Sequence, residues 1–249
     1  MSDDAIPAAT LVLFRESGAG PAEHLFVERA GTMAFAAGAI VFPGGRVDAG
    51  DRRLAEAFAD LDPGDAAARV AAVRETIEEA GVAVGINPRP DAGQVAALRS
   101  GLLEGTVFAD LLGAQRLSLD PSPLVPFARW RPNFRETRVF DTRFYLAEAA
   151  GGAASVDATE NVRLFWATAQ FVLDEAAAGR VKIIFPTRRN LERLAALGNF
   201  AAARAQAAQI APETISPWIE DRAGAPHLCI PERRGYPVTA EPMESVRRG

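Results

Sequence analysis

The clearest periodic pattern of apolar and polar positions lies in residues 65–82. On a helix with about 100° per residue, one side carries Ala66, Val70, Val73, Ile77 and Ala80. The opposite stripe carries Glu75, Glu78 and Glu79. Gly81 can supply the left-handed residue that ends a helix, and Asp65, after Pro63-Gly64, can supply the N-cap. The pattern predicts a helix whose apolar side packs on a core and whose acidic stripe faces away from it.

Shorter patterns fill in the rest of the chain. Apolar or alternating runs predict strands at residues 9–15, 24–29, 39–42, 134–147, 161–166 and 181–185. Helical spacing predicts a short helix within 52–64 stopped by Pro63-Gly64, two helices within 91–114 around Gly105, and helices at 168–178, 188–197 and 199–209. The proline-rich tail from residue 211 is expected to pack as extended chain.

Strands that alternate with helices favour an α/β fold with a mixed sheet between helix layers. No repeat or low-complexity linker divides the chain, so we expect one domain over residues 1–249. Its expected additions are an insertion at about 52–64, a helical elaboration at about 88–126, and C-terminal helices with a tail at 187–249.

Composition removes several classes of function. A net charge of −5 argues against a protein that coats nucleic acid, and the longest apolar stretches are too short to cross a bilayer. The first residues lack the features of a signal peptide, so a cytoplasmic location is expected. With Cys229 alone, and His24 and His227 far apart, an intrachain disulfide and a His/Cys zinc site are both excluded. His24 is expected at the surface, at a strand end, and Cys229 is expected to be structural.

The three glutamates on one stripe repel one another unless a cation lies among them. Mg²⁺ prefers oxygen ligands and is usually held by one or two carboxylates together with substrate phosphates. The alternative is a solvated acidic face on which Arg74 pairs with Glu78 one turn on. Phe42-Pro43-Gly44-Gly45, a strand end followed by a turn where backbone can approach a ligand, favours the metal site.

These two segments resemble the Nudix box, G-x5-E-x7-R-E-U-x-E-E-x-G-U, in which U is a bulky aliphatic residue. Residues 74–82 supply the arginine, the three glutamates, the glycine and the final aliphatic residue of the second half, with Thr76 at its first U position, and Phe-Pro-Gly-Gly is the usual entry to the first. The first half departs from the pattern, because Ala66 occupies the position of the first glutamate counted back from Arg74. Counted forward from Gly45 that position is Asp51, and 22 residues separate Asp51 from Arg74 where the pattern has 7. Long Nudix hydrolases, including peroxisomal coenzyme A diphosphatases, carry an insertion at this place.

The resemblance implies a Nudix-type α/β/α sandwich that hydrolyses a small-molecule diphosphate with Mg²⁺ or Mn²⁺. It implies Glu78 and Glu79 as principal metal ligands, Glu75 as ligand or base, and Arg74 as the residue that orients a glutamate. Asp51 and the carbonyl of Gly45 are further candidate ligands. Glu160 and Glu136, in polar segments outside the box, are candidates for another ligand or the base.

Substrate recognition is less defined by the sequence. Candidates for contacts with the substrate are Arg29, Gly44, Gly45, Arg46, Arg138 and Glu160, and either Arg138 or Arg143 can face a phosphate. A coenzyme A signature, L-L-T-x-R-[SA]-x3-R-x3-G-x3-F-P-G-G, matches Leu25 to Gly45 without a gap. It departs at Phe26 and Val27, and Ala34 replaces its second arginine. We expect coenzyme A or an acyl derivative as substrate.

Three alternatives stay open at this stage. ADP-ribose or another nucleoside diphosphate derivative can replace coenzyme A as the substrate. The chain can also be a Nudix-fold module that senses a nucleotide without hydrolysis, although such modules usually lose box glutamates that this chain retains. A homodimer is as compatible with the sequence as a monomer.

Overall fold

A mixed β-sheet forms the centre of the protein. The structure, a computed structural model, describes residues 5–18, 20–30, 36–132, 139–149 and 161–246. Within these residues the main sheet has eight strands. Six follow the order β10-β7-β8-β1-β2-β3, while β4 pairs with β1 and β9 with β2. They are β1 Ile6–Arg15, β2 Glu23–Arg29, β3 Ile40–Val41, β4 Gly44–Arg46, β7 Val125–Trp130, β8 Phe140–Glu148, β9 Asn161–Thr168 and β10 Thr214–Ile215.

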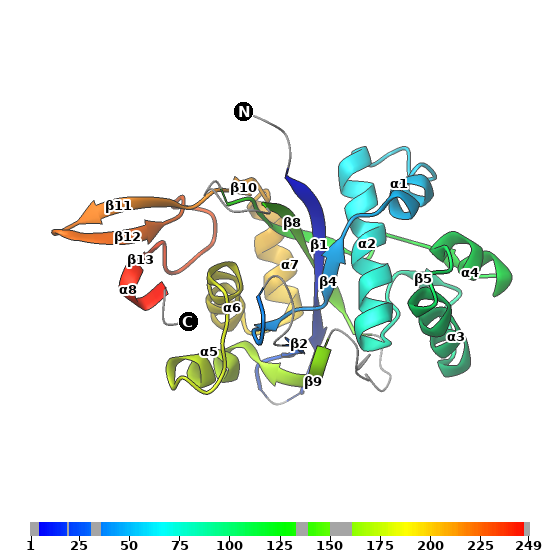
Figure 1. Ribbon diagram of the computed structural model, residues 1–249, viewed down its shortest axis with the longest axis horizontal. Helices are drawn as coiled ribbons and strands as arrows, with labels where there is room; N and C mark the ends of the chain where they lie inside the picture. The colour runs from blue at the N-terminus through cyan, green and yellow to red at the C-terminus, as the bar shows by residue number, and fades with distance from the viewer. Residues whose placement is uncertain (1–4, 19, 31–35, 133–138, 150–160, 247–249) are drawn as a thin grey trace.

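Alternate side chains of β1 supply two separate cores. Leu11 and Leu13 pack with α2, Pro63–Ala80, on one face of the sheet, whereas Val12 and Phe14 pack on the other. The second face is covered by α5 Ala169–Ala177, α6 Phe185–Leu197 and α7 Phe200–Gln209. Figure 1 shows the sheet between these two layers. The predicted α/β/α sandwich with a mixed sheet is confirmed.

The acidic helix begins earlier than its sequence suggested. Asp62, not Asp65, is the N-cap of α2, and its side chain accepts a hydrogen bond from the amide of Asp65 at 2.9 Å. Pro63 is tolerated in the first turn because the amide it lacks would have no helical partner. Gly81 ends the helix in the left-handed conformation, with φ 64°, as predicted.

The inserted helix is also displaced from its expected place. It is α1, Ala49–Ala55, and Asp51 lies in its first turn rather than ahead of it. Asp48 caps α1 through a reciprocal pair of side-chain bonds with Asp51. The apolar spacing of Leu54, Phe58 and Leu61 misled the prediction, since Phe58 and Leu61 follow the helix and still pack on the first core. Pro63 opens α2 instead of stopping a helix.

The two helices expected within residues 91–114 are present as α3, Ala92–Leu103, and α4, Phe108–Ala114. The short pair β5, Ile86–Asn87, and β6, Ser118–Leu119, closes this elaboration. Arg69 of α2 donates hydrogen bonds to the carbonyls of Pro121 and Leu124, at 3.0 and 2.6 Å, and so ties one end of α2 to it. The elaboration therefore packs along the acidic helix through both apolar and polar contacts.

The predicted strand at 181–185 is wrong. Lys182 forms a single bridge with Ala39, and Phe185 already belongs to α6. A short apolar run cannot distinguish a strand from the start of a buried helix, and Pro186 in the first turn of α6 decides for the helix.

The tail forms more structure than extended chain. A three-stranded sheet joins β11 Trp218–Arg222, β12 Ala225–Cys229 and β13 Ala240–Pro242, followed by α8 Met243–Val246. This sheet extends from the main body at the end of the molecule opposite α3 and α4 (Figure 1). Cys229 is buried within it. The β11–β12 pair joins through Ala223-Gly224, which the prolines elsewhere in the tail obscured at the sequence level.

The tail docks on α6 through buried polar side chains. Arg193, 1% exposed, donates to the carbonyl of Phe127 at 3.0 Å and to Gln206 at 2.6 Å. The backbone of Gly235 lies directly over its guanidinium. Tyr236 donates to Asn190 at 3.0 Å and accepts from the indole of Trp130 at 3.2 Å. A polar seam, formed by Arg189, Asn190 and Arg193 of α6, thus lies under the tail.

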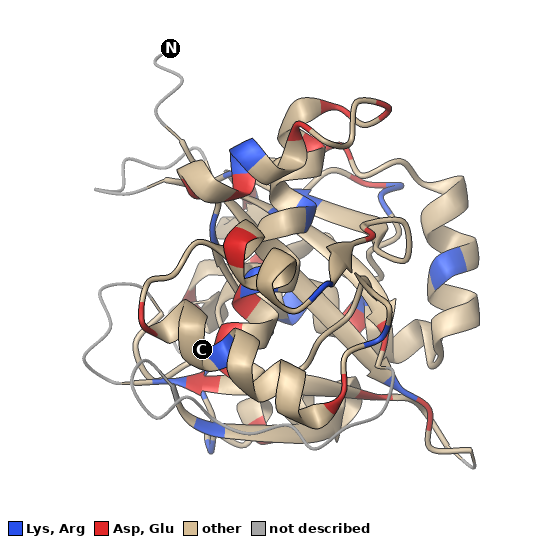
Figure 2. Ribbon diagram, turned by 90° about the vertical axis from the view of Figure 1, so that its right-hand side faces the viewer, with Lys and Arg blue, Asp and Glu red and all other residues tan. Residues whose placement is uncertain are grey.

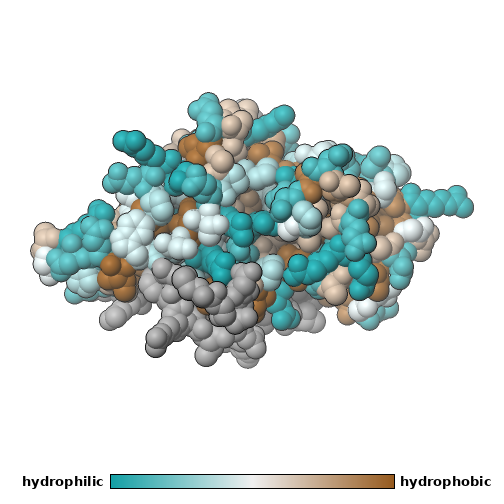
Figure 3. All heavy atoms as spheres, turned by 90° about the horizontal axis from the view of Figure 1, so that it is seen from above, coloured by the Kyte–Doolittle hydropathy of each residue, from teal (hydrophilic) through white to brown (hydrophobic). Residues whose placement is uncertain are grey.

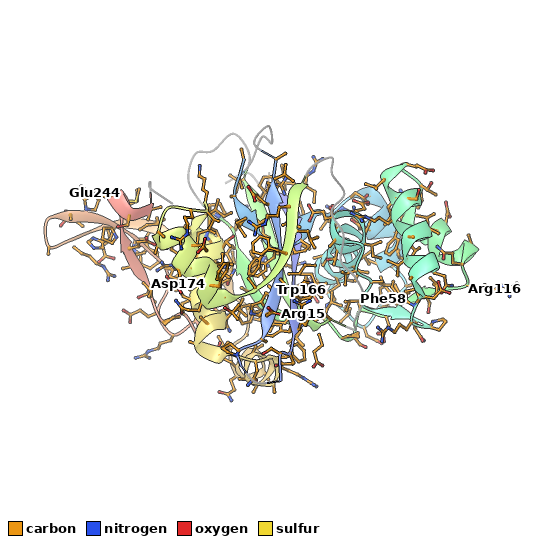
Figure 4. All side chains as sticks on the ribbon, turned by 90° about the horizontal axis from the view of Figure 1, so that it is seen from below. Arg15, Phe58, Arg116, Trp166, Asp174 and Glu244 are labelled. Atoms are coloured by element: carbon orange, nitrogen blue, oxygen red, sulfur yellow. The ribbon has the colours of Figure 1, made fainter. Side chains whose placement is uncertain are left out.

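Surface features include a pair that the sequence did not indicate. Arg15 of β1 lies over the ring of Trp166 of β9, 4.3 Å from its centroid (Figure 4). Seen from above, apolar residues lie singly or in small groups among hydrophilic ones (Figure 3). No helix in the described parts of the chain combines the length and apolar character needed to cross a membrane.

His24 corrects another expectation. It is only 2% exposed, packs against Phe14, Phe26 and Phe42, and its Nδ1 is 3.2 Å from the carbonyl of Leu13. Burial lowers the pKa of this imidazole to about 4, against a smaller opposing effect of the backbone bond. The folded protein therefore holds His24 neutral at pH values where the unfolded chain protonates it.

We expect the free energy of unfolding to fall by about 3 kcal/mol through this group as the pH decreases from 6.5 to 4. His24→Met replaces the titrating imidazole with an apolar side chain. The free energy of unfolding of this variant should therefore lack the part of its pH dependence that His24 causes. Urea unfolding at several pH values measures it, with His227→Met as the control for loss of an imidazole. Parallel slopes in the wild type and His24→Met would contradict the prediction.

Candidate active site

The strand β4 lies directly on the acidic stripe of α2, and glycine makes this approach possible. A Cβ atom at Gly45 would lie 2.3 Å from the carboxylate of Glu75, and one at Gly44 would lie 2.3 Å from the carbonyl of Ala9. The amide of Gly44 donates to Glu79 at 2.9 Å. Glu75 and Glu79 therefore face backbone rather than open solvent, and Glu79 is buried, whereas Glu78 is partly exposed.

Arg74 is the centre of the acidic cluster. Its guanidinium grips Asp51 with two bonds, from Nε to Oδ1 at 2.8 Å and from Nη2 to Oδ2 at 2.9 Å. It also lies 3.0 Å from Glu75 and 3.3 Å from Glu78, and donates to the carbonyl of Arg46 at 3.0 Å. The Arg74–Glu78 pair confirms the contact expected one turn on, but Arg74 is only 8% exposed, so this is not a solvated surface pair.

Electrostatics of the cluster reflect excess buried negative charge. Burial raises the pKa of Glu75 to about 8, because desolvation outweighs the attraction of Arg74 and adds to repulsion by Glu78 and Glu79. Burial likewise raises the pKa of Glu78 and of Asp51, in each case against the stabilising effect of Arg74. Burial alone would lower the pKa of Arg74, but its bond to Asp51 and the surrounding carboxylates raise it. A divalent cation would relieve this repulsion.

The donor set suits a hard cation. Glu75 lies beside the backbone of Gly45, Glu79 accepts from the amide of Gly44, and Glu78 lies against Arg74. All three offer carboxylate oxygens, the ligands that Mg²⁺ and Mn²⁺ prefer. Among the described residues no three acidic, histidine or cysteine side chains already converge on one point as a metal cage. Arg74 lies between Glu75 and Glu78, at 3.0 and 3.3 Å, and a bound cation would share these carboxylates with it.

Comparison with known proteins identifies the fold of the chain. No family model matches the chain, and no curated protein matches its sequence. A Nudix hydrolase from Alicyclobacillus acidocaldarius is similar in structure, with a TM-score of 0.72 and 28% identity over 82% of this chain and 97% of that one. The fold is that of the Nudix hydrolases. This likeness also supports the Nudix family for the chain.

Weaker likenesses extend across the same group of folds. They include the NUDIX domain of Shewanella oneidensis NrtR complexed with ADP ribose, with a TM-score of 0.44, 14% identity and coverage of 77% of this chain and 86% of that one. A C. elegans Ap4A hydrolase binary complex has a TM-score of 0.38, 16% identity and coverage of 70% and 87%. Neither adds to the assignment of the Nudix fold.

The two positions that could correspond to the first glutamate of the Nudix box, Ala66 and Asp51, lie in different surroundings. Ala66 is fully buried in the core on α2, so a glutamate there could not reach the acidic cluster. Asp51 reaches it from α1, across the chain insertion. Its side chain is 0% exposed, and its oxygens accept from Arg74 and from the amide of Asp48. These contacts favour a positioning role through Arg74, and the metal-ligand role of Asp51 stays a prediction.

Other predicted Nudix site residues lie in different surroundings. Arg29 ends β2, and its Nε is buried without a hydrogen-bond partner among the described residues. Arg46 is exposed on β4 and contributes its carbonyl to Arg74. Arg143 lies near Asp62, at 3.7 Å, at the other end of α2 from Glu78. Three candidates, Glu136, Arg138 and Glu160, lie outside the described residues, as does Ala34, the departure from the coenzyme A signature.

The sequence analysis missed one residue that lies beside the acidic cluster. Arg99 of α3 donates to the carbonyls of Glu78 and Glu79, at 2.9 and 3.2 Å. It belongs to no motif, but it is the only charged residue in the Ala- and Leu-rich segment 92–103. A lone arginine on an apolar helix that packs against an acidic helix was the available signal.

Proposed function

We propose that this chain is a metal-dependent hydrolase that cleaves a diphosphate linkage in a nucleoside diphosphate derivative. The observation that carries the proposal is the contact of Gly44 and Gly45 with Glu79 and Glu75 of α2, with Arg74 held among the carboxylates. The structural likeness to a Nudix hydrolase supports a hydrolase. The site residues, the metal and the substrate are inferred from these contacts and from the Nudix box.

The proposed reaction uses the residues in distinct roles. Glu78 and Glu79 are the principal ligands of Mg²⁺ or Mn²⁺, with the carbonyl of Gly45 as a further ligand. When bound, the metal neutralises phosphate charge and orients an attacking water. Glu75 is a ligand or the base that accepts the proton of that water. Arg74 holds Glu75 and Glu78 in place by charge-assisted bonds, and Asp51 holds Arg74.

For the substrate we propose coenzyme A or an acyl derivative, cleaved to a phosphopantetheine and adenosine 3′,5′-bisphosphate. The ungapped match of Leu25 to Gly45 with the coenzyme A signature supports it. The buried Nε of Arg29, which lacks a partner among the described residues, suits an anionic group of the ligand. Ala34 at the place of the second arginine favours the alternative, ADP-ribose or another nucleoside diphosphate derivative.

A panel of diphosphates separates these substrates. The wild-type protein is incubated with coenzyme A, ADP-ribose, NADH and diadenosine polyphosphates at saturating Mg²⁺ and, separately, Mn²⁺, and products are identified by mass spectrometry. The Glu78→Gln/Glu79→Gln double variant is the negative control. We expect coenzyme A to give its two monophosphate products. Cleavage of ADP-ribose with coenzyme A untouched would exclude the coenzyme A proposal and retain the hydrolase.

A nucleotide-sensing module is the second candidate. Glu75, Glu78 and Glu79 are all retained, which favours catalysis over sensing alone. The absence of metal-dependent cleavage of every compound in the panel, together with saturable binding of one of them in calorimetry, would favour the sensing module. A cytoplasmic location and a homodimer stay predictions.

A further inference from the structure

The last turn of α2 carries the two proposed metal ligands, and its backbone needs partners from outside the helix. The last four carbonyls of a helix have no intrahelical amide to accept from. The amide of Gly81 satisfies Ile77 at 2.9 Å. The next two carbonyls, those of Glu78 and Glu79, accept from Nε and Nη2 of Arg99. One guanidinium thus grips the main chain of both ligand residues.

Arg99 also supplies a charge that α2 lacks. The C-terminal end of a helix carries partial negative charge, and basic residues in the last turn usually balance it. The last turn of α2 contains no basic residue and two acidic ones. Arg99 provides the positive charge from α3, a different element of the chain. Arg99 therefore both donates hydrogen bonds to the end of α2 and balances the partial negative charge there.

Arg99 is itself held firmly. Its neighbour Leu98 is fully buried, and Leu102, one turn further along α3, is also buried in the core that α2 shares. Asp91 and Gln94 form a reciprocal capping box at the start of α3. The guanidinium thus extends from a fixed helix toward the end of α2. Acidic and basic residues are interspersed on this side of the molecule (Figure 2).

We infer that Arg99 is a positioning residue that fixes the last turn of α2, and with it the carboxylates of Glu78 and Glu79, in the arrangement that binds the cation. This gives the helical elaboration a role in the site. The inference rests on the proposed function only in naming the cation; the restraint of the helix end is independent of it.

The direction in which the affinity for a divalent cation changes when Arg99 is removed distinguishes a positioning residue from a mere nearby positive charge. If Arg99 acted only as a nearby positive charge, its removal would strengthen binding of a divalent cation. If it positions the ligands, its removal weakens binding, by about tenfold, as for other groups that hold metal ligands in place. Arg99→Met removes the charge and both donors and retains much of the stem. Arg99→Lys retains the charge without the two-donor fork.

The experiment measures Mn²⁺ binding to the full chain by electron paramagnetic resonance, and amide hydrogen exchange of the segment 77–82 without metal. Arg116→Met is the matched control, an exposed arginine of the same elaboration far from α2 (Figure 4). We expect Arg99→Met to weaken Mn²⁺ binding about tenfold and to speed exchange in 77–82, Arg99→Lys to show part of each effect, and Arg116→Met to match the wild type.

Two results would overturn the inference: unchanged or stronger Mn²⁺ binding in Arg99→Met, or unchanged exchange of segment 77–82. If Arg99→Met does not fold, Arg99→Lys decides by the same two readouts. If the wild type binds no Mn²⁺ and cleaves no diphosphate, the proposed function fails. Hydrogen exchange then decides alone whether Arg99 restrains the helix end.

Discussion

Replacing Glu78 or Glu79 with glutamine is expected to lower metal-dependent turnover by about 10³-fold, because a neutral amide cannot replace a charged ligand of the cation. Loss of several kcal/mol of charge stabilisation at roughly 1.4 kcal/mol per factor of ten gives this magnitude. The free energy of unfolding without metal should be unchanged or higher, since both changes relieve repulsion within the acidic stripe. Turnover under saturating Mg²⁺ and urea unfolding without metal measure the two effects.

Glu104→Gln is the matched control for these variants. Glu104 follows α3, is exposed, and accepts a hydrogen bond from Ser100 at 2.9 Å. The same change of acid to amide there should leave turnover at the wild-type level. Wild-type turnover in both Glu78→Gln and Glu79→Gln would exclude the assignment of the site. A loss of activity accompanied by unfolding would instead point to a structural role for the two acids.

Asp51→Ala is expected to reduce the free energy of unfolding by about 2–3 kcal/mol, because it removes the two charge-assisted bonds to the guanidinium of Arg74, which keeps Glu75 and Glu78 as partners. Turnover should fall by about 10–100-fold, since Arg74 no longer holds Glu75 and Glu78 in place. Urea unfolding of the metal-free protein and steady-state kinetics measure these effects. Ala66→Glu is not expected to restore activity to this variant, because that position faces the core.

The control for Asp51→Ala is Asp48→Ala. Asp48 forms the same capping box, but its side chain is 55% exposed and lies 3.9 Å from Arg74. Loss of the cap should cost about 1 kcal/mol, with little change in turnover. If Asp51 is a metal ligand rather than a support for Arg74, the metal-free Asp51→Ala protein will be as stable as Asp48→Ala, and only its metal affinity will fall.

The acidic helix was predictable because several independent signals agreed on it. Apolar spacing, three glutamates on one stripe and the terminal Gly81 all defined α2, and the structure confirms its end at Ala80. The capping residue was misassigned because Asp62 and Asp65 both precede apolar positions, and only the backbone decides between them. Helical spacing placed Glu75, Glu78 and Glu79 on one stripe, and the resemblance to the Nudix box suggested their metal-binding role, which stays a prediction. The burial of Glu79 was not predictable, since it depends on β4, which lies more than 25 residues earlier.

Contacts between distant segments account for the remaining errors. His24 has the polarity of a surface residue, and only the ring cluster of Phe14, Phe26 and Phe42 explains its burial. Arg99 was missed because its partners are backbone carbonyls, which leave no mark in a sequence. The inserted helix α1 begins at Ala49, earlier than the expected 52–64, and the pairing of Asp51 with Arg74 depends on the approach of α1 to α2.

The polar seam on α6 has a consequence for how the chain is made. A nascent chain that has been synthesised as far as α7 has not yet produced Gly235 and Tyr236, which cover Arg193 and Asn190. Until the tail emerges, the guanidinium groups of Arg189 and Arg193 can be hydrated by water. This region of the unfinished protein therefore presents charged groups instead of a wholly apolar surface, and exposed apolar surface is what makes incomplete chains aggregate. Once the tail is made, Tyr236 and Glu241 replace this water with hydrogen bonds to Asn190 and Arg189, so assembly of this region can wait for the tail.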